Sequence, residues 1–168
     1  QRVFCASLAD VFDNAVDPQW RIEMFRVIAE TKNLDWLLLT KRIGNAHAML
    51  DRCMSAYTHG REGWRDNYLP NVWIGATIVT QEEADRDIPK LLAVPAAKRF
   101  LSMEPLLGKV LLPEVFLKRL HFDGKDYDYP DDAGMIDWVI VGGESGPNAR
   151  PMHPDWARSL RDQCVAAR

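Results

Sequence analysis

Ionisable, hydroxyl and glycine residues follow five short apolar runs of this sequence. A carboxylate such as that of Glu104 can act as a general base or bind an amino or hydroxyl group of a ligand. A lysine such as Lys41 can form a Schiff base where a hydrophobic site removes its water. The residues that follow the runs, in order, are Ser7 and Asp10, then Thr40 to Arg42, Gly75 to Thr77, Ser102 to Glu104, and Gly142 to Gly146.

The spacing of the apolar runs indicates the fold. They begin roughly 30 to 40 residues apart, the length of a strand, a crossover helix and the next strand. This predicts an α/β fold with a parallel sheet of about five strands. Two architectures stay open, an open part of a (β/α) TIM-like barrel or a flavodoxin-like open sheet. In either, the carboxyl ends of the strands share one rim, where we expect Asp10, Thr40, Glu104 and Glu144.

The glycine-rich turn after the last run is the strongest local signal. Gly142 and Gly143 allow a ligand to approach backbone N–H groups closely, and Glu144 and Ser145 add polar side chains at the same place. The alternative is a plain turn with a solvated glutamate. Arg150 and His153 follow before the last expected helix; they could lie over the same rim, or serve as a surface arginine and a helix cap.

The polar residues after the earlier runs have structural alternatives as well. Thr40 and Lys41 could belong to a binding or catalytic site, or simply end a strand. Ser102 and Glu104 follow the fourth run, and Glu104 could act as a base or form a salt bridge with Lys41 or Arg42. Of the two polar residues after the first run, Asp10 is the stronger candidate because apolar residues flank it.

The connections between the runs read mostly as helices. Thr80 to Glu83 has the form of a capping box, so a helix begins there, and Pro89 should bend or split it. Another helix should begin at Asp17 and Pro18, with Trp20, Met24, Val27 and Ile28 on its buried face. The remaining expected helices span 45–56 and 154–167.

Two further segments carry expectations about exposure. Trp64 lies in a polar loop and is expected to be the exposed exception among tryptophans that otherwise pack in the core. Residues 109–135 read as an insertion loop, and its Asp- and Tyr-rich middle, 121–134, should have low local stability.

Composition narrows the class of protein. The chain has 168 residues, 47% of them hydrophobic, which suits one α/β domain over 1–168; the abrupt ends suggest a fragment of a longer fold. The net charge of -3 gives no basic excess, so nucleic acid is possible as a partner but is not indicated by charge. Three dispersed cysteines and no long apolar segment favour a cytoplasmic protein without membrane contact; the oligomeric state stays open.

The runs and their polar ends resemble, in order, a family of phage and prophage proteins, the gp thirty-seven / gp sixty-eight family. The resemblance rests on five segments of the sequence and on Arg150 to Pro154; the segments are 3–12, 37–42, 71–75, 99–108 and 137–146. That family is similar to radical S-adenosylmethionine enzymes, whose partial barrels bind a [4Fe-4S] cluster. The resemblance therefore implies S-adenosylmethionine and a cluster as cofactors, with the cysteine ligands outside this chain.

Three hypotheses follow. The first is an enzyme fragment that binds a small-molecule cofactor at the rim, with Lys41 and Glu104 as catalytic candidates. Its binding residues would be Ser7, Asp10, Thr40, Ser102, Gly142, Gly143, Glu144, Ser145, Arg150 and His153, with no metal ligand among them. The second is a cofactor-free lyase or isomerase in which Lys41 and Glu104 carry the chemistry. The third is a non-catalytic, phage-encoded module that binds nucleic acid or nucleotides.

Overall fold

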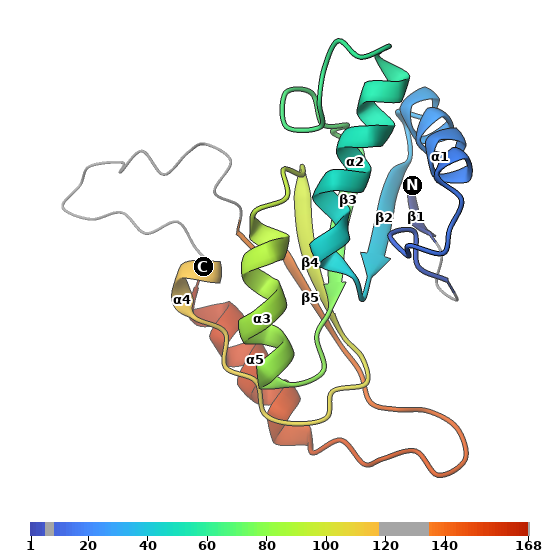
Figure 1. Cartoon of the computed structure of the whole chain (residues 1–168). Helices are drawn as coiled ribbons and strands as arrows, with labels where there is room; N and C mark the ends of the chain where they lie inside the picture. The colour runs from blue at the N-terminus through green and yellow to red at the C-terminus, as the bar shows by residue number, and fades with distance from the viewer. Residues whose placement is uncertain (6–8, 118–134, 168) are drawn as a thin grey trace, which may run out of the picture.

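The computed structural model describes residues 1–5, 9–117 and 135–167, which form an α/β fold (Figure 1). Strands and helices alternate along the chain, as the spacing of the apolar runs predicts. The strands are β1 (Arg2–Cys5), β2 (Asp35–Thr40), β3 (Val72–Thr77), β4 (Lys98–Met103) and β5 (Trp138–Val141). The helices are α1 (Pro18–Glu30), α2 (Ile43–Tyr57), α3 (Gln81–Leu92), the short α4 (Glu114–Leu117) and α5 (Pro154–Ala166).

The five strands form one parallel sheet in the order β1-β2-β3-β4-β5, curled like half of a barrel. The prediction of a parallel sheet is thus confirmed. Each strand pairs with its neighbour in the chain, and the order never reverses, whereas a doubly wound sheet of the flavodoxin type reverses at a switch point. The structure therefore favours the curled sheet over the flavodoxin-like alternative.

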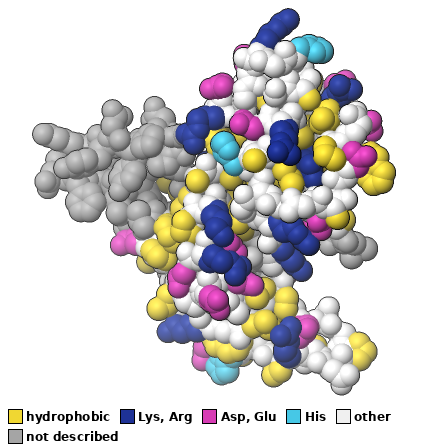
Figure 2. Space-filling view, viewed as in Figure 1, with side chains coloured by type: hydrophobic (Ala, Val, Ile, Leu, Met, Phe, Trp, Pro, Cys, Tyr) yellow, Lys and Arg dark blue, Asp and Glu magenta, His cyan; other side chains and the backbone are white. Residues whose placement is uncertain are grey.

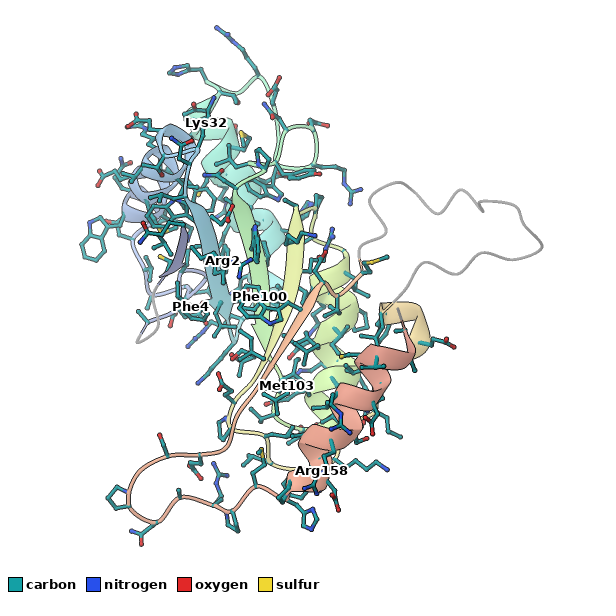
Figure 3. All side chains as sticks on the ribbon, turned by 180° about the vertical axis from the view of Figure 1, so that it is seen from behind. Arg2, Phe4, Lys32, Phe100, Met103 and Arg158 are labelled. Atoms are coloured by element: carbon teal, nitrogen blue, oxygen red, sulfur yellow. The ribbon has the colours of Figure 1, made fainter. Side chains whose placement is uncertain are left out.

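Helices pack on one face of the sheet and leave the other face uncovered. The main core lies between the helices and alternate strand residues, such as Leu38, Ile74 and Leu101. The residues between them point to the opposite face, because successive side chains of a strand alternate in direction. Seen from behind, no helix lies in front of the sheet (Figure 3).

Helix α1 begins as predicted but buries a different face. Asp17 is its N-cap and accepts a hydrogen bond from the Gln19 N–H at 2.8 Å, with Pro18 in the first turn. Trp20 is nevertheless 68% exposed and Val27 is 49% exposed, so the expectation that both pack inward is wrong. The buried face of the helix is made by Arg21, Phe25, Ile28 and Ala29. Arg21 can lie there because its guanidinium donates to the Val11 and Asp13 carbonyls.

Helix α3 has the predicted cap. The Thr80 hydroxyl accepts from the Glu83 N–H at 3.3 Å, and the Glu83 carboxylate accepts from the Val79 N–H at 2.7 Å. Pro89 does not split the helix, which runs unbroken from Gln81 to Leu92, and the alternative expectation of a bend stays a prediction. Pro89 lies near the C-terminal end, and the neighbouring Ile88 and Leu91 are anchored in the core. Helix α2 begins at Ile43 and ends at Tyr57, slightly outside the expected range.

Trp64 is fully buried, so the expectation of an exposed loop tryptophan is wrong. Its indole N–H donates to the Pro95 carbonyl at 2.7 Å, and its backbone N–H donates to Asp51 Oδ1 at 2.6 Å. The ring contacts Phe25 edge to face. The polar loop after α2 therefore folds back over the core and is held there by this side chain.

The beginning of the expected insertion packs on the domain. Val110 and Leu112 are buried, and the Gln163 amide of α5 bonds to the Val110 carbonyl and the Leu112 N–H. The low stability expected for 121–134 concerns a segment outside the described residues. Helix α5 starts one residue after its cap, His153, and Leu160 is its buried residue.

Candidate functional site at the strand ends

Polar residues at the carboxyl ends of the strands form two groups. One group surrounds Asp10 and lies beside the end of β2. The other surrounds Glu104 and lies where β3, β4 and β5 end. Among the described residues, no hydrogen bond or ion pair joins Glu104 to Lys41 or Arg42, so the salt bridge considered as its alternative role is not formed.

Asp10 ties the loop after β1 to the end of β2. Its carboxylate accepts from the Thr40 hydroxyl at 2.7 Å and from the Lys41 backbone N–H at 2.9 Å. It also caps its own turn by accepting from the Phe12 N–H at 3.0 Å. The Thr40 hydroxyl in turn accepts from the Arg42 N–H at 2.8 Å. The structure brings Asp10 and Thr40 together, but their polar atoms already bind one another.

The cations of this group differ in their surroundings. Arg42 forms ion pairs with Asp10 at 3.3 Å and with Asp13 at 2.9 Å, so two carboxylates hold its guanidinium. Lys41 is exposed. A lysine that forms a Schiff base needs an environment poor in water, which an exposed position does not provide. Lys41 is therefore the weaker of the two catalytic candidates.

The second group contains two hydroxyls and a carboxylate on the uncovered face of the sheet. Ser102 pairs in register with Thr77, the last residue of β3. The Ser102 hydroxyl lies 3.4 Å from Glu104 Oε2 and donates to it. The Thr77 hydroxyl oxygen is buried and has no hydrogen-bond partner among the described residues. A buried hydroxyl without a partner costs about 1–3 kcal/mol, so a polar ligand group that reached this atom would remove that cost.

Gly142 makes room for the Glu104 carboxylate. A Cβ atom at Gly142 would overlap with that carboxylate, so a larger residue here would require the Glu104 side chain to move. The Gly142 N–H, which the sequence suggested as a donor to a ligand, donates to the Met103 carbonyl at 3.2 Å instead. The Gly142 carbonyl accepts from the Leu106 N–H at 2.9 Å. These bonds fix the turn that carries Glu104 against β5.

Glu144 and Arg150 bind each other rather than lining an open site. The Glu144 carboxylate accepts from the Arg150 backbone N–H at 2.9 Å, from its Nε at 2.7 Å and from its Nη2 at 3.1 Å. The side-chain bonds, followed by the backbone bond, lower the pKa of Glu144 to about 2. A carboxylate with these partners stays ionised and closes the loop between residues 144 and 150.

The remaining candidates in this loop are structural or exposed. His153 caps α5, because its Nδ1 accepts from the Asp155 N–H at 3.2 Å. Gly143 lies against Met152, and Ser145 is exposed. Ser7 lies outside the described residues.

Thr77 was missing from the candidates chosen on sequence. The signal was nevertheless present, because Thr77 ends the third apolar run just as Thr40 ends the second. What the sequence does not show is that its hydroxyl lacks a partner. That depends on the register between β3 and β4.

The cysteines lie apart in the structure. Cys5 is in β1, Cys53 is buried in α2 and Cys164 is in α5, and all are free thiols. Burial raises the pKa of Cys53 to about 11, so its thiol stays protonated. In the described part of the chain, no group of three His, Cys, Asp or Glu side chains could hold a metal ion.

The surface gives two further observations. Basic and acidic side chains are interspersed over the helix-covered face, without a continuous basic patch on that face (Figure 2). None of the helices in the described ranges combines the length and the apolar character needed to cross a membrane.

Comparison with known proteins places the chain in a family without giving it a function. No curated protein and no solved structure matches it. One family model matches residues 1–168, over the full length of the sequence, and its description is "Protein of unknown function (DUF5131)". The chain therefore belongs to the DUF5131 family of proteins of unknown function.

Proposed function

We propose that the chain is part of an enzyme that binds a small-molecule cofactor of the S-adenosylmethionine class at the rim where β3, β4 and β5 end. One observation carries the proposal. The Thr77 hydroxyl is buried and has no partner in the described part of the chain, and the Ser102 hydroxyl and the Glu104 carboxylate belong to the same rim. A ligand group that binds this hydroxyl would remove the cost of leaving it unpaired.

The three side chains suit the amino-acid end of such a cofactor. The Glu104 carboxylate is exposed and can accept from a ligand ammonium group in charge-assisted hydrogen bonds. The Thr77 hydroxyl can donate to a ligand carboxylate, whereas the Ser102 hydroxyl donates to Glu104 and keeps its lone pairs as acceptors. The ammonium and carboxylate of an α-amino acid are close together; on the rim, Thr77 is in register with Ser102, whose hydroxyl contacts Glu104. The rim thus offers a charged acceptor for the ammonium group and a neutral donor for the carboxylate.

A [4Fe-4S] cluster does not fit the described residues. Cys5, Cys53 and Cys164 lie in three different elements, and Cys53 is buried in the helix core. When S-adenosylmethionine and a cluster are bound together, they supply radical chemistry. The role proposed for this chain is to bind and orient the cofactor.

We place this half-barrel within a (β/α) barrel of the kind found in radical S-adenosylmethionine enzymes, in a phage- or prophage-borne protein. Two features support this. The strand order is consecutive, and all of the main core lies on one side of the sheet. The motif resemblance described above supports the phage-borne family.

Calorimetric titration of the protein with S-adenosylmethionine, without oxygen, tests the proposal. Glu104→Gln keeps the side chain's shape and removes its charge. It should cost about 1.5–3 kcal/mol of binding, the range for hydrogen bonds to a charged group. Glu30→Gln, at the exposed end of α1, is the matched control and should bind as the parent protein does. Glu144→Gln distinguishes the two rim carboxylates. It should leave the affinity unchanged, because the Glu144 carboxylate already binds the Arg150 side chain.

Thr77→Val provides a second test, because it should affect stability and cofactor affinity in different ways. Removing an unpaired buried hydroxyl should leave the free energy of unfolding unchanged or raise it, whereas the affinity for the cofactor should fall. Equal affinities for the parent protein, Glu104→Gln and Thr77→Val would reject the rim as the binding site. A loss with Glu144→Gln alone would move the site to the loop after β5.

A further inference from the structure

The uncovered face of the sheet carries a layer of aromatic side chains that is separate from the main core. Leu37 and Phe100 are buried, yet neither belongs to the core beneath the helices. Phe100 lies across Gly75, where any Cβ atom would overlap with its ring. Phe4 is 44% exposed and Trp138 is 39% exposed. Arg2, Phe4 and Phe100 are seen together on this face in Figure 3.

The rings of this layer contact one another across four strands. Phe100 contacts Phe4 edge to face and Trp138 in a tilted arrangement, each at a centroid distance of 6.2 Å. Trp138 in turn meets Trp73 edge to face at 6.4 Å. Because the rings support one another, the exposed surfaces of Phe4 and Trp138 are held in place. Such fixed, exposed rings are suited to stacking on a planar ligand.

Arg2 places a cation on this aromatic layer. Its guanidinium carbon lies 4.9 Å from the ring centroid of Trp73 and 5.6 Å from that of Trp138. Among the described residues, no acidic side chain pairs with Arg2. Lys98, at the start of β4, is already paired with Asp137 at 2.8 Å. Asp35 is the register partner of Arg2 on β2, and no ion pair joins the two side chains in the described part of the chain. The layer therefore presents one positioned cation that is free of an ion pair.

We propose that this face, defined by Arg2, Phe4, Trp73, Phe100 and Trp138, binds a planar aromatic anion of the mononucleotide class. The base stacks on the exposed surfaces of Phe4 and Trp138, and the phosphate pairs with Arg2. One cation matches one phosphate. A single-stranded nucleic acid would need cations spaced along its backbone, and this face presents only Arg2 unpaired in the described part of the chain. The site goes beyond the proposed cofactor rim and uses none of its side chains.

Titration with adenosine 5′-monophosphate tests this site, with adenosine and inorganic phosphate as partial ligands. The nucleotide should bind saturably and more tightly than either partial ligand. Arg2→Gln should weaken nucleotide binding by about tenfold or more, as expected for a lost hydrogen bond to a charged group, and leave adenosine binding unchanged. Trp138→Leu should weaken both. Arg26→Gln, on the exposed side of α1, is the matched control and should change neither.

Two further controls show that a loss of binding is not caused by unfolding of a variant and does not arise at the cofactor rim. Thermal unfolding followed by circular dichroism must show that each variant is folded, and Arg2→Lys, which retains the charge, should keep more affinity than Arg2→Gln. Glu104→Gln should leave nucleotide binding unchanged, so the two sites succeed or fail separately. Absence of saturable nucleotide binding, or an equal loss with Arg26→Gln, would overturn the proposal. So would tighter binding of a single-stranded oligonucleotide with a steep salt dependence, or a dimer that Trp138→Leu dissociates.

Discussion

Glu144 and Arg150 close a loop by binding each other through both the side chain and the backbone of the arginine. Because these bonds favour the ionised form, the pKa of Glu144 in the folded protein falls to about 2, from 4.5 in the absence of partners. The bonds therefore support the loop fully above pH 4.5, and their support is lost as the pH falls through 2.

A carbon-13 titration of the Glu144 carboxyl group in the folded protein measures this directly. The midpoint should lie far below the ordinary glutamate value. Arg150→Gln should raise it toward 4.5, whereas Arg158→Gln should not, because Arg158 pairs with Asp155. An ordinary midpoint in the parent protein would show that the pair is not formed in solution.

Trp64 and Trp20 provide a matched pair for measuring burial. Trp64→Ala removes a fully buried ring and its bond to the Pro95 carbonyl, and should lower the free energy of unfolding by about 3–5 kcal/mol. Trp20 is 68% exposed, and Trp20→Ala should change the free energy of unfolding by no more than about 0.5 kcal/mol. Urea unfolding followed by circular dichroism compares the two. Similar losses for both variants would contradict the burial of Trp64.

Gly75→Ala tests the close approach of Phe100 to the sheet. The added methyl group would overlap with the Phe100 ring, and such overpacking should lower the free energy of unfolding by about 1–3 kcal/mol. Gly108→Ala is the control, because nothing lies within 4 Å of the added carbon. Phe100→Leu should relieve part of the cost of Gly75→Ala. Strictly additive effects in this double-mutant cycle would mean that the two residues do not touch.

The strands were predictable from sequence because they depend on local runs. An apolar run followed by polar residues located each of β1 to β5, and the capping box located the start of α3. Burial was less predictable. A helical periodicity identifies the residues that share one face of a helix but not what covers that face, so it predicts a buried Trp20 although the side chain is exposed. The burial of Trp64 cannot be predicted from its polar loop, because the residues that its side chain contacts, Phe25 and Pro95, are distant in sequence.

In the candidate site, too, the position of the polar residues could be predicted from the sequence, whereas their contacts could not. That polar residues gather at the strand ends followed from the parallel fold. Which of them bind one another did not, because pairs such as Asp10 with Thr40 depend on loop paths that the sequence does not reveal. The unpaired hydroxyl of Thr77 depends on strand register and on the absence of a nearby acceptor. These are properties of three-dimensional packing.

The consecutive order of the strands also bears on how the chain folds. Each strand pairs only with the strand before and after it, so every pairing in the sheet closes a loop of one strand-helix unit. Loops of that size keep the contact order lower than a sheet that joins distant segments, and lower contact order accelerates folding. A chain of this topology can add one unit at a time as it leaves the ribosome, with each new strand docking onto an edge that is already formed.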